Sequence, residues 1–181
     1  MMKTLAILLT AVGLAGAADA PTVAGLYDAQ LKNAEGEVVS LAEAMPASKF
    51  DFKPAASLGE FAKVRTFAEQ CKHVAAVNYL VAASALGEKP PVDLGKGEDG
   101  PADVKGKDAV VKFLKDSFAY AHKAMNSLTD KNQLDMIAGP FGNEKSPRAG
   151  LANVAVWHSF DHYGQMVVYA RMNGVVPPAS R

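Results

Sequence analysis

The sequence has a single cysteine, Cys71, and no excess of either sign of charge, with 19 basic and 19 acidic residues among 181. One cysteine excludes an internal disulfide, so the fold must be stabilised by its apolar core, with or without a metal ion. The lack of net positive charge argues against a phosphate-binding surface, and we expect no nucleic-acid partner. Beyond the N-terminus there is no run of about 18 apolar residues, so no internal membrane span is expected.

The first 20 residues have the pattern of a cleavable signal peptide. A basic residue precedes a short apolar stretch at residues 5–14, and small residues follow it up to Ala20. We expect cleavage after Ala17 or Ala18, because cleavage after Ala20 would leave a proline directly behind the cut. An uncleaved anchor is the alternative. The pattern predicts a secreted or periplasmic protein whose folded domain spans residues 21–181.

Four stretches have the apolar periodicity of amphipathic helices, and none has the alternation of a strand. The helices are expected from about Val23 to Met45, Leu58 to Leu86, Lys107 to Leu128 and Arg148 to Met172. Four amphipathic helices without strands predict an all-α protein, a four-helix bundle.

A capping-box pattern, in which Glu60 follows Ser57 by three residues, predicts that the second of these helices begins near residue 58. The joints at residues 89–106 and 129–147 are unusually long for a compact domain and rich in proline and glycine. An extended joint of about 18 residues reaches roughly 60 Å, whereas a helix of about 29 residues is roughly 43 Å long. The first joint can therefore cross the bundle lengthwise, and an up-down-up-down order is not required.

Two histidines four residues apart in the last predicted helix, His158 and His162, are the strongest sign of chemistry. On a helix this spacing puts two side chains on one face, with Cβ atoms about 5–6 Å apart. Both lie in the apolar stripe that faces the interior, where an unpartnered imidazole is costly and a shared metal ion would remove that cost. The alternative is a pair of core histidines hydrogen-bonded to polar neighbours.

A third metal ligand would have to come from another helix. The zinc-protease interpretation fails, because Ser159 stands where that chemistry needs a glutamate. His73 and His122 are the only other histidines. His73 lies beside the apolar stripe of its helix, one turn after Glu69, whose carboxylate is a candidate acceptor for the His73 ring N–H. A solvated surface carboxylate is the alternative for Glu69, and a satisfied core or boundary role is expected for His122.

Two other residues are expected to have no chemical role. Cys71 falls on the apolar arc of the second predicted helix, which favours a buried and inert thiol. Trp157 directly precedes the histidine pair and is expected to pack.

Several motifs together resemble the DinB/YfiT-like bundle family of the DinB superfamily. The family pattern H-x-x-x-H-[RY]-G-Q, followed by Tyr, Arg and Gly, is matched by His158, His162, Tyr163, Gly164, Gln165, Tyr169, Arg171 and Gly174. A histidine midway along the second predicted helix and the Phe-Asp-Phe-Lys-Pro segment at residues 50–54 are similar as well. The resemblance covers residues 22–178.

The resemblance implies a four-helix bundle with long crossover loops that binds one divalent metal ion through His73, His158 and His162. Zinc or nickel is the expected ion, with iron or manganese as alternatives. Gln165 and Glu69 are candidates for contact with these ligands or with a substrate.

The implied activity is metal-dependent thiol transfer or hydrolysis on a small molecule, because some members of the family are thiol-dependent transferases. No catalytic residue is identified, and the pattern lacks an evident general base. A non-catalytic metal-binding or structural bundle and an envelope sensor are the alternatives. Bundles of this kind often pair, so a homodimer is an alternative to a monomer.

Overall fold

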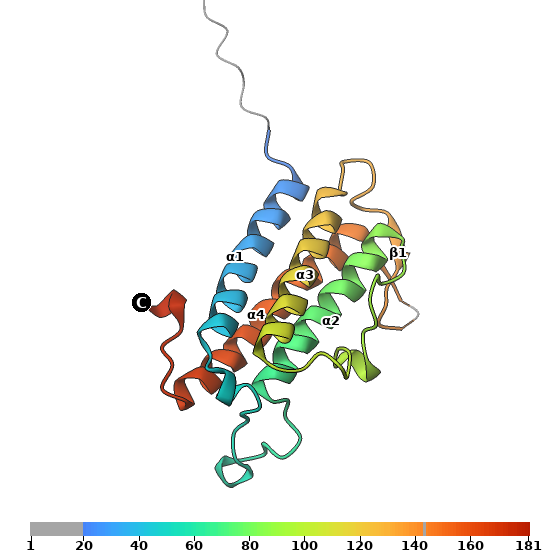
Figure 1. Ribbon diagram of the computed structural model, residues 1–181. Helices are drawn as coiled ribbons and strands as arrows, with labels where there is room; N and C mark the ends of the chain where they lie inside the picture. Colours follow the sequence, from blue (N-terminus) through green and yellow to red (C-terminus); the bar gives the residue numbers. More distant parts are fainter. Residues whose placement is uncertain (1–19, 143) are drawn as a thin grey trace, which may run out of the picture.

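The computed structural model describes residues 20–142 and 144–181, and four long helices make up most of it (Figure 1). They are α1 (Val23–Ala44), α2 (Phe67–Leu86), α3 (Lys107–Asn126) and α4 (Arg148–Met172). The predicted all-α four-helix bundle is confirmed. Residues 1–19, which hold nearly all of the predicted signal peptide and both of its expected cleavage sites, lie outside the described residues.

The helices do not follow an up-down-up-down order. α1 packs on α3 and α4, and α2 packs on the same two helices, so α1 and α2 lie diagonally opposite each other. Contacts near the helix ends establish the directions: Asn126 of α3 with Asp28 of α1, Lys123 of α3 with Glu88 just after α2, and Arg148 of α4 with Ala85 of α2. α1 and α4 therefore run one way and α2 and α3 the other, and the chain between α2 and α3 crosses the bundle lengthwise (Figure 1).

The joint between α3 and α4 contains a small β-ribbon that the sequence did not predict. β1 (Met136–Ala138) pairs antiparallel with β2 (Lys145–Pro147), with Ile137 opposite Ser146. Three residues are too few for the alternation of a strand to be visible in a sequence. β2 leads directly into α4, so the ribbon holds the start of that helix.

The predicted start of the second helix is wrong. α2 begins at Phe67 rather than near residue 58, and a short 3-10 turn ends at Gly59, whose φ of 144° lies outside any helical region. The capping box that forms is a later one. The Thr66 side chain accepts a hydrogen bond from the Glu69 backbone N–H at 3.2 Å, and the Glu69 carboxylate accepts one from the Thr66 N–H at 2.7 Å.

The two capping-box patterns can be distinguished by mutation. Thr66→Ala is expected to lower the free energy of unfolding by about 1 kcal/mol, because it removes the acceptor for a first-turn N–H. Ser57→Ala is expected to change it by less than about 0.5 kcal/mol, because Ser57 caps no long helix. Urea unfolding followed by circular dichroism measures both. Equal losses would contradict the start of α2 at Phe67.

The exposed fractions of Cys71 and Trp157 test the expectation that both side chains pack. Cys71 is fully buried, as expected, and this burial strongly raises the pKa of its thiol. Trp157 does not pack as expected, because 55% of its surface is exposed on the outer side of α4.

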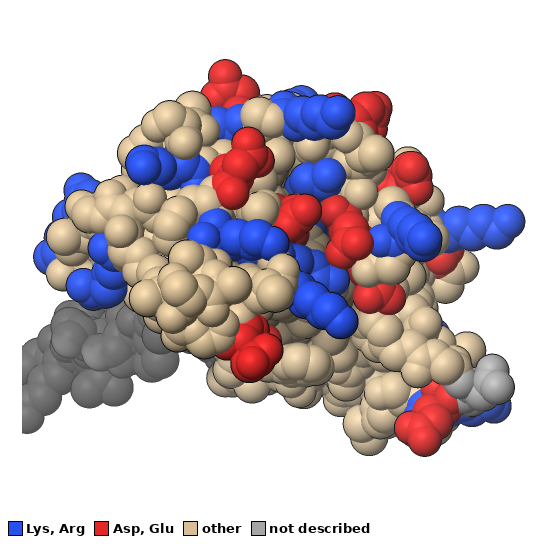
Figure 2. All heavy atoms as spheres, turned by 90° about the horizontal axis from the view of Figure 1, so that it is seen from below, with Lys and Arg blue, Asp and Glu red and all other residues tan. Residues whose placement is uncertain are grey.

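No helix in the described part of the chain is both long and apolar enough to cross a bilayer. At the end of the bundle where α2 begins, acidic and basic side chains are interspersed over the surface (Figure 2).

Candidate metal centre

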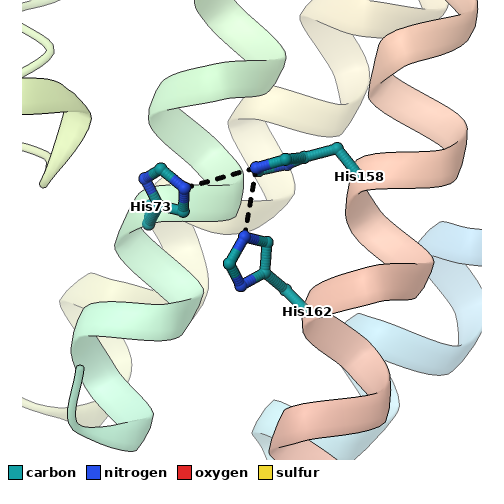
Figure 3. Close-up of side chains that lie close together, drawn as sticks. All are labelled: His73, His158 and His162. Atoms are coloured by element: carbon teal, nitrogen blue, oxygen red, sulfur yellow. Dashed lines mark hydrogen bonds between the residues drawn. The ribbon is translucent and has the colours of Figure 1, made fainter. Parts of the chain in front are cut away.

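The structure brings together three histidines from two helices that are distant in the sequence. His73 lies in the second turn of α2, and His158 and His162 lie on the facing side of α4 (Figure 3). The Nε2 atom of His158 lies 3.3 Å from that of His73 and 3.1 Å from that of His162. One ring nitrogen from each histidine falls within 4.8 Å of the other two, so the predicted residues converge on a common point.

The tautomer of His73 is set by a backbone carbonyl. Its Nδ1 lies 2.9 Å from the oxygen of Glu98, which can only accept, so Nδ1 carries the proton and Nε2 presents a lone pair to the other rings. Glu98 and Gly97 both have a φ of 62°, an uncommon conformation for a residue with a side chain. Of the two alternatives for Glu69, the structure agrees with the exposed surface carboxylate, which caps α2 and does not orient His73.

The tautomer of His162 is set by a glutamine. His162 Nδ1 lies 2.5 Å from Oε1 of Gln70, which is 2% exposed. The Gln70 amide in turn donates to Oε1 of Gln165 at 3.0 Å, and Gln165 donates to Asp161 at 3.3 Å. In this series of hydrogen bonds the Gln70 oxygen accepts the proton of His162 Nδ1. The Nε2 atom of His162 therefore carries no proton and presents a lone pair, as in His73.

The sequence did not point to Gln70, whereas Gln165, a candidate for contact with the ligands or a substrate, lines the cavity and reaches His162 through Gln70. Gln165 touches Gln70 and Asp161, so it acts on His162 through Gln70. The available signal for Gln70 was its position three residues before His73, which puts the two side chains on one face of α2.

His158 lies between the other two rings. Its Nε2 faces both neighbouring lone pairs, and its Nδ1 is buried with no hydrogen-bond partner among the described residues. A proton on the His158 Nε2 could point at only one neighbour. At least one close pair of nitrogens therefore has no proton between its atoms, an arrangement that calls for a cation.

Protonation of the imidazoles does not supply that positive charge near pH 7, because burial disfavours the charged rings. Burial is the main cause that lowers the pKa of all three imidazoles, to about 3 for His158 and about 4 for His162. Each ring also feels the positive charge of the nearby Arg65 guanidinium. The rings are consequently neutral near pH 7, the state in which imidazole binds a metal.

The nitrogen spacing fits a divalent ion. A tetrahedral ion with nitrogens at about 2.0–2.1 Å holds neighbouring ligand atoms about 3.3 Å apart. The observed separations of 3.1 and 3.3 Å agree with that value. No carboxylate or cysteine of the described residues joins the cluster.

His122 has no part in this site. Its ring lies between α3 and α1, with Nδ1 2.6 Å from Asp28 and Nε2 3.2 Å from Glu35. It occupies the boundary position that was expected and is not a fourth ligand.

A cavity of about 620 Å³ opens beside the histidines. Its lining includes the buried side chains of His162 and Gln70 and the exposed Gln165. Charged side chains of both signs complete it: Lys53, Lys63, Arg65, Glu69 and Asp99. A volume of this size is typical of sites for small molecules. The histidine cluster therefore adjoins a space into which a ligand can enter.

Comparison with known proteins agrees with this architecture. A family model described as the DinB superfamily matches residues 30–166. A conserved protein from Enterococcus faecalis has a crystal structure that matches with a TM-score of 0.66 at 16% identity, over 84% of this chain and 98% of that one. YfiT from Bacillus subtilis, described as a probable metal-dependent hydrolase with an unusual four-helix bundle topology, matches with a TM-score of 0.60 at 16% identity, over 84% and 88%. No curated protein matches the sequence.

Proposed function

The chain belongs to the DinB superfamily, and on that basis we propose that it is a metal-dependent enzyme acting on a small molecule. His73, His158 and His162 would hold one divalent ion, zinc or nickel in preference to iron or manganese. YfiT is described as a probable metal-dependent hydrolase, which favours hydrolysis here over thiol transfer.

The proposal is carried by the arrangement of the three Nε2 atoms. Two of them present lone pairs to the His158 nitrogen at 3.1 and 3.3 Å. Since a proton on the His158 Nε2 can serve only one neighbour, at least one of these two pairs of neutral rings repels unless a cation lies between its nitrogens. A divalent ion would satisfy all three nitrogens at once, and the separations of 3.1 and 3.3 Å match those between neighbouring ligands of a tetrahedral ion.

The protein's contribution is to fix the rings and leave the site accessible. The Glu98 carbonyl and the Gln70 amide hold the rings of His73 and His162 in the tautomer that binds through Nε2. A divalent ion held by three neutral ligands keeps its full charge and lowers the pKa of a water molecule or thiol that it binds. The adjoining cavity gives a substrate access to the same point.

The structural alternative, in which an ion only joins α2 to α4, would be favoured by a fourth protein ligand. None of the described residues supplies one, and His122 is held elsewhere by Asp28 and Glu35. An open position beside a cavity is the arrangement of catalytic rather than structural sites. We also propose, from the N-terminal pattern alone, that the protein acts in the periplasm or outside the cell.

Metal analysis combined with an activity screen tests this function. We expect one ion per chain by elemental analysis, and turnover of a member of a panel of small esters, amides and thioesters that stops with chelator and returns with zinc or nickel. Thiol transfer is assayed in parallel with a low-molecular-weight thiol. One bound ion without any chelator-sensitive turnover would support the structural alternative, and a metal-free protein would contradict the proposal.

Gln70 provides a separate test through the orientation of His162. Gln70→Leu is expected to weaken metal affinity about 10- to 100-fold, because the His162 Nδ1–H loses its acceptor. Gln165→Leu removes the partner of the Gln70 amide but leaves the Gln70 contact with His162, and it is expected to have a smaller effect on metal affinity. Competition with a chromophoric chelator measures both affinities. An unchanged affinity in Gln70→Leu would show that this hydrogen bond does not support metal binding.

A further inference from the structure

We propose that the substrate carries an oxyanion, a carboxylate or phosphate group, that binds among Lys53, Lys63 and Arg65 at the mouth of the cavity beside His162. The inference rests on the proposed function, because it names the class of substrate that the same site would take.

The cavity brings basic side chains next to the histidine cluster. Lys53, Lys63 and Arg65 line it together with His162. The view onto this end of the bundle shows many charged side chains crowded around the middle of the face (Figure 2). Only Ala62 and Val64 supply apolar side chains to the lining. The surroundings therefore suit a polar ligand better than an apolar one.

The acidic residues of the cavity already have partners within the protein. Asp99 accepts two hydrogen bonds from Arg65, at 2.9 and 3.2 Å. Glu69 accepts the capping hydrogen bond from the Thr66 N–H at 2.7 Å. Neither carboxylate forms an ion pair with a lysine among the described residues. Glu69 keeps its negative charge, but Glu69 and Asp99 together do not balance the positive charges of Lys53, Lys63 and Arg65 in the lining.

The two lysines have no anionic partner in the described part of the chain. The Lys53 ammonium donates to the backbone carbonyl of Ala62 at 3.1 Å, and neither Lys53 nor Lys63 forms an ion pair. Because Ala62 directly precedes Lys63, this hydrogen bond holds the two lysine-bearing segments against each other.

The platform for these charges is anchored to the helices of the site. The Phe67 N–H donates to the Phe52 carbonyl at 2.9 Å, which ties the segment before Lys53 to the start of α2. The Tyr169 hydroxyl of α4 donates to the Arg65 carbonyl at 3.1 Å. The basic groups are thus held near the histidines by the same two helices that carry the histidines.

Electrostatics selects an anion for this position. Two ammonium groups that form no ion pair would raise the potential in the cavity, and a divalent ion held by neutral imidazoles would add its full positive charge. Basic side chains outnumber acidic ones in the lining, three to two, and a cleft whose charge is positive on balance attracts anionic ligands and repels cationic ones. A carboxylate or phosphate held at the rim would leave the rest of the substrate directed toward His162.

The test is calorimetric titration of the zinc-loaded protein with succinate, inorganic phosphate and the neutral succinamide. Binding is compared in the wild type, in the double variant Lys53→Gln/Lys63→Gln, and in the control Lys131→Gln/Lys145→Gln. The control removes two exposed lysines that form no ion pair and lie in the joint at the other end of the bundle. Circular dichroism and elemental analysis check the fold and metal content of each variant.

At least one of the two anions, and not succinamide, is expected to bind the wild type and the control, and to bind the double variant about tenfold more weakly. The anion that binds more tightly distinguishes a carboxylate substrate from a phosphate substrate. Equal affinity in the double variant and the wild type, or binding of neither anion, would overturn the proposal.

The same titrations on chelator-treated protein separate this inference from the proposed function. Binding of an anion that depends on the two lysines, in a protein that never takes up metal, would support the subsite while the metalloenzyme proposal failed. Normal metal content with anion binding that does not depend on the lysines would overturn the subsite and leave the metal site standing.

Discussion

Replacement of His158 by alanine is expected to abolish stoichiometric binding of a divalent ion. Its Nε2 lies between those of His73 and His162, at 3.3 and 3.1 Å, so it is the ligand that joins the other two. Two remaining imidazoles, one on each helix, do not make a tight site for zinc, which takes at least three protein ligands in catalytic sites. Elemental analysis after gel filtration should find one ion per chain in the wild type and almost none in the variant.

The same substitution is expected to remove the stabilisation that metal gives. An ion present at about 100 times its dissociation constant adds about 2.7 kcal/mol to the free energy of unfolding. For a domain of this size that corresponds to a rise of about 5–10 °C in melting temperature. The difference between scans with zinc and with chelator should have this size in the wild type and be close to zero in His158→Ala.

His122→Ala is the matched control. It removes a histidine that contacts Asp28 and Glu35 at a different helix interface, so it is expected to lower the melting temperature. It should nevertheless retain both the bound ion and the zinc-dependent rise. Full metal content in His158→Ala, or loss of metal in His122→Ala, would contradict the assignment of the ligands.

The metal-free protein is expected to lose stability steeply as the pH falls from about 7 toward 4. Burial lowers the pKa of His158 to about 3 and that of His162 to about 4, and it also lowers the pKa of His73. In the unfolded chain these groups bind protons near the ordinary histidine pKa of about 6.5. Between the two values the unfolded state holds more protons, so the free energy of unfolding decreases as the pH falls and is unaffected above about pH 7.

Thermal unfolding in chelator at a series of pH values measures this dependence. The variant His73→Gln/His158→Gln/His162→Gln keeps polar side chains at the three positions but cannot take up the protons. Its melting temperature should fall less between pH 6.5 and 4.5, and the difference from the wild type isolates the histidines from the carboxylates that titrate in the same range. Parallel curves for the two proteins would contradict the neutral, buried state of the rings.

The helices were predictable from the sequence where their signals are local. The starts of α1, α3 and α4 and the end of α2 fall at the predicted residues, because apolar periodicity and glycine or proline mark them. The start of α2 could not be predicted, because two capping-box patterns begin within ten residues of each other. Gly59 stands inside the first pattern, and Thr66 with Glu69 forms the second.

The metal ligands were predictable for a different reason. His158 and His162 share a face through their spacing alone, and the resemblance to the DinB family singled out His73. Their orienting partners were not predictable in the same way. The Glu98 carbonyl comes from a loop whose path depends on left-handed backbone at residues 97 and 98, and Gln70 reaches His162 only because α2 packs against α4.

The sequence by itself determined the helical bundle and the pairing of His158 with His162, because periodicity and spacing along one chain encode them. His73 followed from the resemblance to the family, and the length of the first joint permitted a crossover without requiring it. Only the tertiary structure decided which groups hold each imidazole in its tautomer, where His122 lies, and that unpaired lysines face the same cavity. The tautomers and the place of His122 depend on distances between atoms that are 25 to 95 residues apart in sequence, such as those from His73 to Glu98 and from Gln70 to Gln165. Such distances arise only when the helices pack.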